Sequence, residues 1–514
     1  PMDADAYVKK YADFLTANSL PKTAVLPNSA EVDNYNAGIT TDWLKEATQS
    51  GQIQENNLSI SNGTDKYQYF ISGSKLKQDG VVKGYQFQKT NFRINIDSQI
   101  TDYLKVGTSA FFTENNYDGG RANFLYATAM SPYSVPKNTN GSYLIYPMNP
   151  ELLYANPLLG LVTDRMNRGK NISGSAFAEL KLIDGLTYRL NGAYTYNQDQ
   201  FGSYTGRAAN DNSGTAIVSN AETSNWVLEN ILTYKKDFNK HHIDLTGLYS
   251  AQKVDYFRSE GRAVGFINDG LSYNNLSAGT TKSNFSNANG YSLLSQMGRM
   301  NYSYDSRYLL TVTARRDGYS AFGANTNKYG IFPSLALGWN IKNETFLKDV
   351  KLVNNLKLRF SLGKTGNQAI GVNQTATTAS TVQEPFDNVA LTGILYNNLG
   401  NANLNWESTV SSNLGVDFSI LDSRIGGSIE FYKSKTNDIL LRRSIPNITG
   451  YSSVWANLGE MQNKGLEISL NTVNVRSKDF SWKTDLNFSK YKNELLNLYG
   501  DGKDDIGKNW FIGK

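Results

Sequence analysis

Alternation of apolar and polar residues with a period of two recurs along most of this 514-residue chain. Leu356, Leu358 and Phe360 are separated by polar residues, and the run from Thr187 to Tyr196 places Tyr and Leu at alternate positions. Successive side chains of a strand point to opposite faces, so such runs predict strands with one apolar and one polar face. The chain is therefore predicted to be all-β.

The number and length of these runs indicate a large antiparallel sheet. We count roughly 16 strands of about 9–13 residues, near the length that crosses a bilayer at a tilt. The predicted strands lie at residues 55–61, 67–75, 91–99, 103–114, 171–182, 186–198, 224–235, 242–254, 290–304, 307–316, 331–340, 355–364, 407–420, 424–434, 463–473 and 480–491.

Short and long connections are predicted to alternate between these strands. The short turns are expected at Asn62-Gly63, Thr101-Asp102, Asp184-Gly185, Asp305-Ser306 and Asp422-Ser423. The long polar loops are expected at residues 115–170, 199–223, 255–289, 365–406 and 435–462. Membrane barrels have short periplasmic turns and long extracellular loops, whereas a soluble sandwich has no reason to sort its loops in this way.

Composition is compatible with such a barrel. The mean hydropathy of −0.46 resembles that of a soluble protein, but a membrane barrel places its apolar residues only at every second position. Lys and Arg number 51 against 46 Asp and Glu, a net charge of 51 − 46 = +5. That surplus is too small over this length to indicate a nucleic-acid partner.

The size of the sheet predicts which of its two faces is exposed to water. A barrel of about sixteen strands is too wide for side chains to fill, so polar residues are expected to line the lumen and apolar residues to face lipid. Trp226, Tyr304 and Trp339 near strand ends are expected at the membrane interfaces, where aromatic residues gather. Each could equally be an ordinary aromatic residue of a sheet.

Residues that carry catalysis or bind metals are scarce. The absence of Cys excludes disulfides, thiolate zinc sites and a cysteine nucleophile. The two histidines, His241 and His242, are adjacent, so in a strand they point to opposite faces and cannot share a metal. The acidic run from Asp501 to Asp505 lacks the Gly and the closing Glu at the positions that a calcium loop requires. No catalytic or metal-binding residue is predicted.

Four loop tyrosines are candidates for contact with a substrate. Tyr143, Tyr146, Tyr154 and Tyr273 lie in stretches rich in Tyr and Asn. Aromatic faces and amide donors suit sugars or peptides. The same residues could instead pack loop against loop or against a partner.

Several collinear segments resemble the SusC/RagA family of TonB-dependent outer-membrane transporters of Bacteroidetes. These segments are Asp79 to Gly84, Arg316 to Trp339, Leu356 to Gln368, Asn403 to Thr409 and Asn457 to Glu467. The residues that carry the motifs include Arg316, Asp317, Gly318, Phe332, Pro333, Trp406, Glu407, Gly459 and Glu460. Departures are few: Ala321 stands where Arg is usual, and Ala402 where Pro is common.

The resemblance implies a partial antiparallel transmembrane β-barrel, with about sixteen of the family's twenty-two strands. Residues 1–54 are expected to be an extracellular loop or leader with a short helix, 55–491 to hold the barrel strands and loops, and 492–514 to begin a further extracellular loop. The family's plug, N-terminal domain and closing strands have no counterpart here.

For function, the resemblance implies TonB-dependent import of a bulky nutrient, an oligosaccharide or a peptide, across the outer membrane of a Gram-negative, Bacteroidetes-like cell, without catalysis. It implies as partners a SusD-like lipoprotein lid, TonB–ExbB–ExbD through the plug, outer-membrane lipid and a dimer of transporter–lid pairs. No cofactor is indicated, and calcium in the lid or loops has no support in these residues. The alternatives are a passive porin or secretion barrel and a soluble all-β carbohydrate-binding or adhesive protein.

Overall fold

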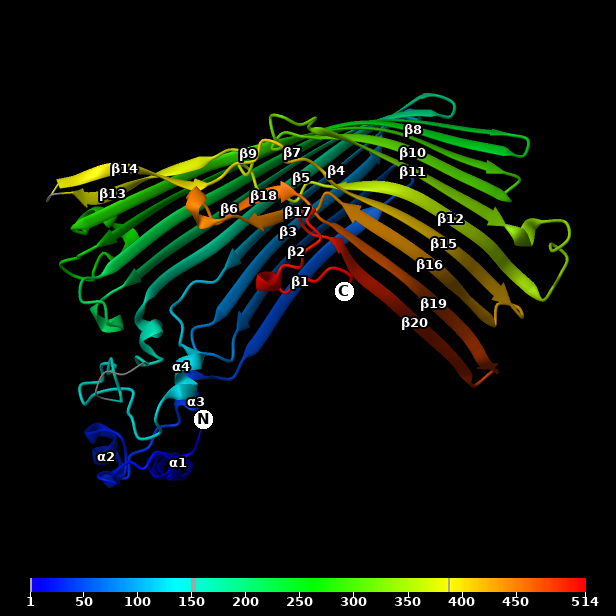
Figure 1. The fold of residues 1–514 in the computed structure, drawn as a ribbon. Helices are drawn as coiled ribbons and strands as arrows, with labels where there is room; N and C mark the ends of the chain where they lie inside the picture. Colours follow the sequence, from blue (N-terminus) through cyan, green and yellow to red (C-terminus); the bar gives the residue numbers. More distant parts are fainter. Residues whose placement is uncertain (1, 149–153, 387–388) are drawn as a thin grey trace.

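One antiparallel sheet of 16 strands dominates the computed structural model, which describes all residues except 1, 149–153 and 387–388. Every strand pairs with its neighbours in chain order, and the sheet curves into an open trough (Figure 1). Among the described residues, β1 pairs only with β2 and β20 only with β19. The sheet is therefore the wall of a partial barrel, and the predicted fold class is confirmed.

The strands of this sheet are β1 (Gln52–Gly63), β2 (Tyr67–Asp79), β3 (Gln86–Gln99), β4 (Leu104–Asn116), β5 (Asp164–Ile183), β6 (Leu186–Thr205), β7 (Thr215–Phe238), β8 (His241–Val264), β9 (Thr281–Tyr304), β10 (Tyr308–Tyr319), β11 (Tyr329–Asn340), β12 (Val353–Asn367), β15 (Glu407–Ile420), β16 (Ile425–Asn437), β19 (Glu460–Arg476) and β20 (Ser481–Asn497).

The remaining elements lie in the connections and in the N-terminal segment. Two hairpins that the sequence did not predict are formed by β13 (Thr378–Phe386) with β14 (Val389–Asn398) and by β17 (Leu440–Ser444) with β18 (Ser453–Asn457). The helices are α1 (Ala4–Ala17), α2 (Ser29–Asn36), α3 (Trp43–Ala47) and α4 (Phe124–Ala129), with 3-10 turns η1 (Leu159–Val162), η2 (Arg207–Ala209), η3 (Ser272–Asn274), η4 (Leu276–Ala278), η5 (Ile341–Asn343), η6 (Asn447–Thr449) and η7 (Ile506–Lys508).

The N-terminal segment is helical and packs on the loops. Asp3 caps α1 by accepting a hydrogen bond from the backbone N–H of Ala6 at 2.7 Å. Trp43 of α3 is buried and donates its indole N–H to the carbonyl of Ser131 at 2.9 Å. Within the described residues, every helix is too short or too polar to act as a transmembrane helix.

The strands in the middle of the sheet are much longer than the sequence indicated. The strands β7, β8 and β9 each have 24 residues. Most of the loops predicted at 199–223 and 255–289 therefore belong to strands, and only residues 206–214 and 265–280 lie between them. Apolar residues in these strand ends, such as Ile217 and Val218, do not alternate regularly with polar ones, so the ends carry no clear period-two signal although the backbone ladder continues.

Short turns lie at one end of the strands and longer loops at the other (Figure 1). At the turn end, Asp305 and Ser306 have φ of 50° and 53° in the tight three-residue connection 305–307 between the paired residues Tyr304 and Tyr308. Asn62 and Gly63 still belong to β1, so the first turn lies slightly later than predicted, at residues 64–66. The connection at 341–352 is an exception, since it is long but lies at the turn end.

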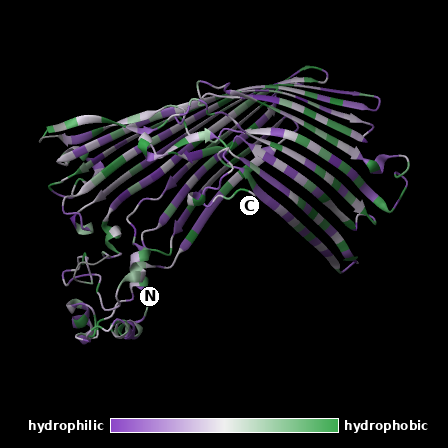
Figure 2. Ribbon diagram, in the orientation of Figure 1, coloured by the Kyte–Doolittle hydropathy of each residue, from purple (hydrophilic) through white to green (hydrophobic). Residues whose placement is uncertain are grey.

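The two faces of the sheet differ sharply in chemistry, and apolar and polar residues alternate along the strands (Figure 2). One row in register across β12, β15, β16, β19 and β20 is entirely apolar: Leu358, Val416, Ile429, Ile468 and Phe488. The next row, on the opposite face, is Arg359, Gly415, Glu430, Glu467 and Ser489. The sequence correctly predicted this separation into an apolar and a polar face.

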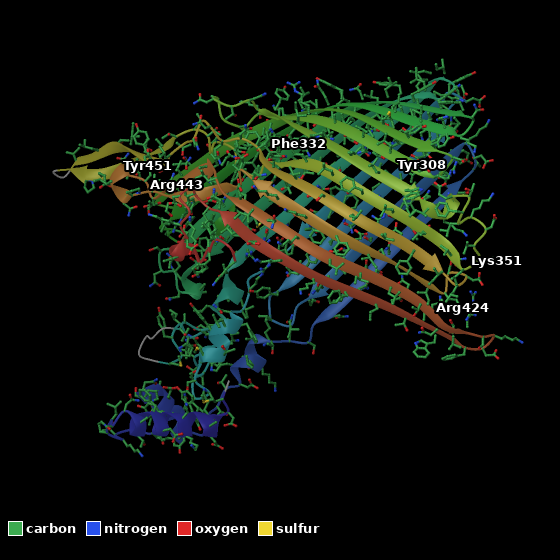
Figure 3. The ribbon with its side chains drawn as sticks, turned by 45° about the vertical axis from the view of Figure 1, so that its right-hand side comes forward. Tyr308, Phe332, Lys351, Arg424, Arg443 and Tyr451 are labelled. Atoms are coloured by element: carbon green, nitrogen blue, oxygen red, sulfur yellow. The ribbon has the colours of Figure 1, made fainter. Side chains whose placement is uncertain are left out.

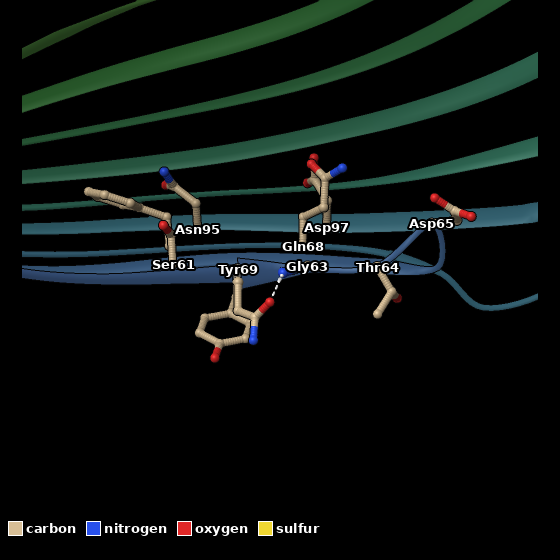
Figure 4. Close-up of a pocket in the computed structure, with 10 residues that line it drawn as sticks. Ser61, Gly63, Thr64, Asp65, Gln68, Tyr69, Asn95 and Asp97 are labelled. Atoms are coloured by element: carbon tan, nitrogen blue, oxygen red, sulfur yellow. Dashed lines mark hydrogen bonds between the residues drawn. The ribbon is translucent and has the colours of Figure 1, made fainter.

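The polar face is the inner, concave one. Polar-face side chains from β7 through β12 line a single hollow, and only the concave side of a curved sheet brings such separate strands around one space. At the other edge of the sheet, Figure 4 shows Gln68, Asn95 and Asp97 on one side of the strands and Tyr69 on the other. On the outer face, Phe431 is 56% exposed and Phe488 50%, as expected for side chains that would meet lipid.

Candidate functional site

The inner wall bears a hollow of about 710 Å³. Its lining combines charged, hydroxyl and amide groups with a few large apolar side chains. These residues include Glu229, Gln252, Ser295, Arg299, Thr313, Arg315, Asp317, Phe332, Lys364, Gln368 and Trp406. Such a surface can bind polar solutes through hydrogen bonds but contains no assembled catalytic group.

Arg315 and Asp317 form an ion pair on this inner face. Because they are two residues apart on β10, their side chains point the same way, and Arg315 Nε lies 2.8 Å from both carboxylate oxygens of Asp317. Arg315 also donates to the hydroxyl of Ser295 at 2.9 Å. The position of both residues on β10 holds the ion pair in place, with its positive and negative groups side by side on the inner wall.

The neighbouring motif residue, Arg316, points to the outer face. Its guanidinium stacks over the ring of Tyr329 at 3.8 Å from the centroid. Gly318 makes room for this ring, since a Cβ there would lie 2.4 Å from Tyr329 Cε1. Pro333 sits one residue before the β11–β12 ladder begins at Ser334, a place where a strand tolerates a residue without an N–H.

A second ion cluster lies farther round the inner wall. Arg359 binds both carboxylate oxygens of Asp417 at 2.7 Å and also donates to Glu430 at 2.8 Å. Asn413 donates to the second oxygen of Glu430 at 3.0 Å. Bidentate pairing of this kind fixes the guanidinium plane, so the cluster forms a rigid polar patch.

Phe332 and Trp406 anchor the loop between β12 and β15 to the inner wall. Their rings meet edge to face at 5.2 Å within a buried cluster, and the indole N–H of Trp406 donates to the carbonyl of Lys328 at 3.1 Å. Gly366 leaves the space for both rings, since a Cβ there would lie 2.1 Å from Phe332 Cζ. Figure 3 shows Phe332 near the loop end of the sheet and Tyr308 near the turn end.

The other motif residues tie the β17–β18 hairpin to the barrel. Glu407 accepts hydrogen bonds from the N–H of Leu440 at 3.1 Å and from the side chain of Asn367 at 3.2 Å. Gly459 has φ of +86°, which favours glycine, and Glu460 pairs with Lys435 at 2.8 Å. These residues therefore connect the β17–β18 hairpin to the loop ends of the wall strands.

The four candidate tyrosines are half-buried in loop packing. Tyr143 lies under the ammonium of Lys137 at 5.0 Å. Tyr154 meets the ring of Tyr126 edge to face at 5.2 Å. They are not brought together with Tyr273, which packs on a separate cluster. Contact with a substrate stays a prediction.

Tyr146, in the loop after β4, contacts a second loop. Its hydroxyl accepts a hydrogen bond from Asn210 at 3.3 Å, which joins the loop after β4 to the loop after β6. Residues 149–153, in the stretch from Tyr143 to Tyr154 that the sequence singled out, lie outside the described residues.

The predicted interface aromatics lie on the outer face. Tyr304, Tyr308 and Trp339 are in register across β9, β10 and β11 at the turn end, with ring centroids 6.4 and 6.5 Å apart. Trp226 lies on β7, farther from the turns, beside an apolar hollow of about 360 Å³. Their contact with lipid stays a prediction.

Glu344, which the sequence did not single out, organises the aromatic row. It accepts hydrogen bonds from the hydroxyl of Tyr308 at 2.7 Å, the indole of Trp339 at 2.9 Å and Arg307 at 3.0 Å. These donors, Tyr308 first, hold the pKa of the Glu344 carboxyl below its usual range. A lone acidic residue in a connection gives no sequence signal for this role.

The two histidines have separate partners. His241 Nδ1 is 2.7 Å from the hydroxyl of Tyr302, and His242 hydrogen-bonds Asp237. In the part of the chain that the structure describes, no group of three or more His, Asp or Glu is arranged to hold a metal.

The comparisons with known proteins agree with this architecture. Residues 102–513 match the family model described as TonB dependent receptor-like, beta-barrel. TonB-dependent receptor P3 of Formosa agariphila is 35% identical over 490 residues, covering 92% of this chain and 48% of that protein. TonB-dependent receptor SusC of Bacteroides thetaiotaomicron is 29% identical over 552 residues, covering 98% and 52%.

A solved structure of the RagAB peptide transporter superposes with a TM-score of 0.79 at 24% identity, covering 93% of this chain and 55% of the matched one. The chain spans about half the length of the curated relatives it matches. These relatives are receptors and not enzymes, which confirms that no catalysis is to be assigned. The chain belongs to the TonB-dependent receptor β-barrel family, and SusC is among its relatives.

Proposed function

We propose that this chain forms part of the barrel wall of an outer-membrane transporter that imports a bulky nutrient, an oligosaccharide or a peptide, in a TonB-dependent manner. The observation that carries the proposal is the pair of adjacent rows across five strands: Leu358 to Phe488 faces out and is apolar, and Arg359 to Ser489 faces in and is polar. A wall with that polarity suits lipid outside and water inside.

The inner wall supports transport rather than chemistry. Several of its charged groups are paired with one another, as in Arg359 with Asp417 and Glu430, so these groups can hydrogen-bond a passing solute while their charges largely offset. Loops anchored by Phe332 and Trp406 border the hollow on the inner wall. The proposed substrate class, a bulky nutrient, is suggested by the similarity to the RagAB peptide transporter and to SusC.

The partners follow from the same family membership. We propose a SusD-like surface lipoprotein that covers the loop end, and TonB–ExbB–ExbD acting through a plug inside the completed barrel. The unpaired edges of β1 and β20 would be costly in a bilayer, where every backbone group needs a partner. We therefore propose that further strands close the wall. We also propose that two transporter–lid pairs associate as a dimer.

A passive porin or secretion barrel is the first alternative, and a soluble all-β adhesive protein the second. A soluble protein would leave exposed apolar rows such as Phe431, Leu486 and Phe488, between 50% and 57% exposed, in contact with water over a wide area. The loops anchored on the inner wall weigh against an open porin.

Uptake by the full-length receptor tests the proposal. Cells that carry the receptor are compared with cells lacking it, and each is assayed for uptake of labelled oligosaccharide and peptide pools with and without a functional TonB. We expect uptake of one pool that requires both the receptor and TonB. Uptake that persists without TonB would indicate a porin, and recovery of the protein in the soluble fraction without detergent would refute the membrane assignment.

A further inference from the structure

Three lysines stand directly opposite one another on the outer face of neighbouring strands. Lys433 of β16 is in register with Lys464 of β19, which is in register with Lys492 of β20. All three side chains are exposed. With strands about 4.8 Å apart, three ammonium groups can gather within roughly 10 Å. We call these three residues the lysine row.

The row is electrostatically unfavourable on its own. Like charges directly opposite each other on one face of a sheet repel. Among the described residues, Lys433 and Lys464 have no carboxylate within ion-pair distance, and Lys492 has Glu494 at 3.1 Å. By contrast, the next lysine up on β16, Lys435, is paired with Glu460 at 2.8 Å. The lysine row therefore carries unmatched positive charge.

The row lies at the upper border of the apolar band. The next row toward the turn end on the same face holds Leu414, Phe431 and Leu466, with Lys490 of β20 in register with Leu466. The row after that includes Ile429 and Ile468. Lys433 is eight residues from the start of β16 at Ile425. At about 3.3 Å per residue and a tilt of about 40°, that places it roughly 20 Å above the turn end, near the top of an apolar band about 25 Å tall.

We propose that the lysine row binds phosphate groups carried by lipids of the outer leaflet, in which the apolar tails cover Phe431 and Leu466 while the ammonium groups hold the headgroup phosphate. The inference rests on the proposed placement in the outer membrane. A phosphate oxygen is a strong acceptor for an ammonium donor, and a basic cluster at a membrane surface attracts anionic headgroups.

Position favours lipid-borne over free phosphate. Free phosphate would gain only the charge interaction, which salt screens at an exposed site. A lipid anchored by its tails against the adjacent apolar rows presents its phosphate at the height of the lysines without further loss of freedom. Three ammonium groups on adjacent strands also suit a headgroup that carries more than one anionic group.

The test compares two triple variants of the full-length receptor. Lys433→Gln, Lys464→Gln and Lys492→Gln together remove the lysine row. Lys236→Gln, Lys348→Gln and Lys351→Gln together remove the same charge from exposed lysines at or near the turn end; Lys351 is visible there in Figure 3. Each protein is placed in phosphatidylcholine nanodiscs with phosphorylated lipid A or with lipid A whose phosphates have been removed.

Lipid retained by each protein after mild detergent extraction is measured by native mass spectrometry. We expect the unaltered receptor and the turn-end variant to retain phosphorylated lipid A, and the lysine-row variant to retain at least about tenfold less. Dephosphorylated lipid A should be retained weakly by all three proteins, and inorganic phosphate should not compete at equal concentration.

Equal retention by the lysine-row variant, or equal loss in the turn-end variant, would overturn the proposal. So would competition by inorganic phosphate, or a change in oligomeric state with lipid retention unchanged, which would make the row a protein interface. Correct folding is checked by heat-modifiable migration, and the single variant Lys464→Gln serves if the triple variant does not fold. Nutrient uptake, measured on the same proteins, tests the proposed function separately.

Discussion

The side-chain amide of Asn457 makes two reciprocal hydrogen bonds with the backbone of Asn405. Asn457 Oδ1 accepts from the N–H of Asn405, and Asn457 Nδ2 donates to its carbonyl, each at 2.8 Å. The pair joins two motif segments that are far apart in the sequence, one leading into β15 and the other closing the β17–β18 hairpin. It fixes the segment that leads into β15 against the end of the β17–β18 hairpin.

Replacing Asn457 with Leu should loosen this junction. Loss of both bonds leaves the backbone groups of Asn405 without their partner, at a cost of about 1–2 kcal/mol. Urea unfolding of the receptor in lipid vesicles measures the change. Asn403→Leu is the matched control, because Asn403 is exposed; equal destabilisation by the control would contradict the role of the pair.

Gly366→Ala should disturb the anchor formed by Phe332 and Trp406. The added Cβ would lie 2.1 Å from Phe332 and 2.9 Å from Trp406, so the rings must move, at a cost of about 1–3 kcal/mol. Gly298→Ala is the control, since a Cβ there meets nothing within 4 Å. Trp fluorescence and thermal unfolding should change for the first variant and stay near the parent values for the second.

A charge on the outer face should impair insertion, whereas the same charge next to it on the inner face should not. Ile468→Lys places an ammonium group in the apolar band and should cost about 2–4 kcal/mol near its centre. Ser469→Lys, one residue along β19, points into the lumen. Folding into phosphatidylcholine vesicles, followed by guanidine titration, distinguishes them. Similar effects at both positions would contradict the assignment of faces.

The cluster around Glu344 should give the turn end a pH-dependent contribution to stability. The pKa of Glu344 is lowered in the folded protein relative to its ordinary value of 4.5, so the unfolded state takes up the proton first as the pH falls. The stabilisation is complete above the unfolded value and is lost as the pH falls through the folded one. Unfolding midpoints of the parent and Glu344→Gln should therefore differ most near neutral pH and converge in acid.

The strand cores could be predicted because lipid and water impose opposite demands on the two faces of each strand. The alternation of Leu356, Leu358 and Phe360 with Lys357 and Arg359 results from those demands. The same alternation elsewhere in the chain predicted all sixteen wall strands in the right order. Strand ends such as residues 215–223 lack regular alternation, since Ile217 and Val218 are adjacent and most of the following residues are polar, so the same rule does not detect them.

Contacts between distant segments could not be derived from local patterns. Phe332 and Trp406 were recognised as motif residues, but their contact with each other depends on the register of β11, β12 and β15. Tyr146 was singled out for its chemistry, while its bond to Asn210 depends on how two loops fold together. The lysine row is visible only once three strands are aligned.

The length of β7, β8 and β9, at 24 residues each, has a consequence for where capture takes place. At about 3.3 Å per residue and a tilt of about 40°, such strands rise roughly 60 Å, more than twice the height of the apolar band. In the proposed orientation, this part of the wall extends well beyond the membrane on the extracellular side. In the proposed transporter, the loop end of this wall therefore lies some tens of ångströms above the bilayer, outside the dense layer of lipid headgroups.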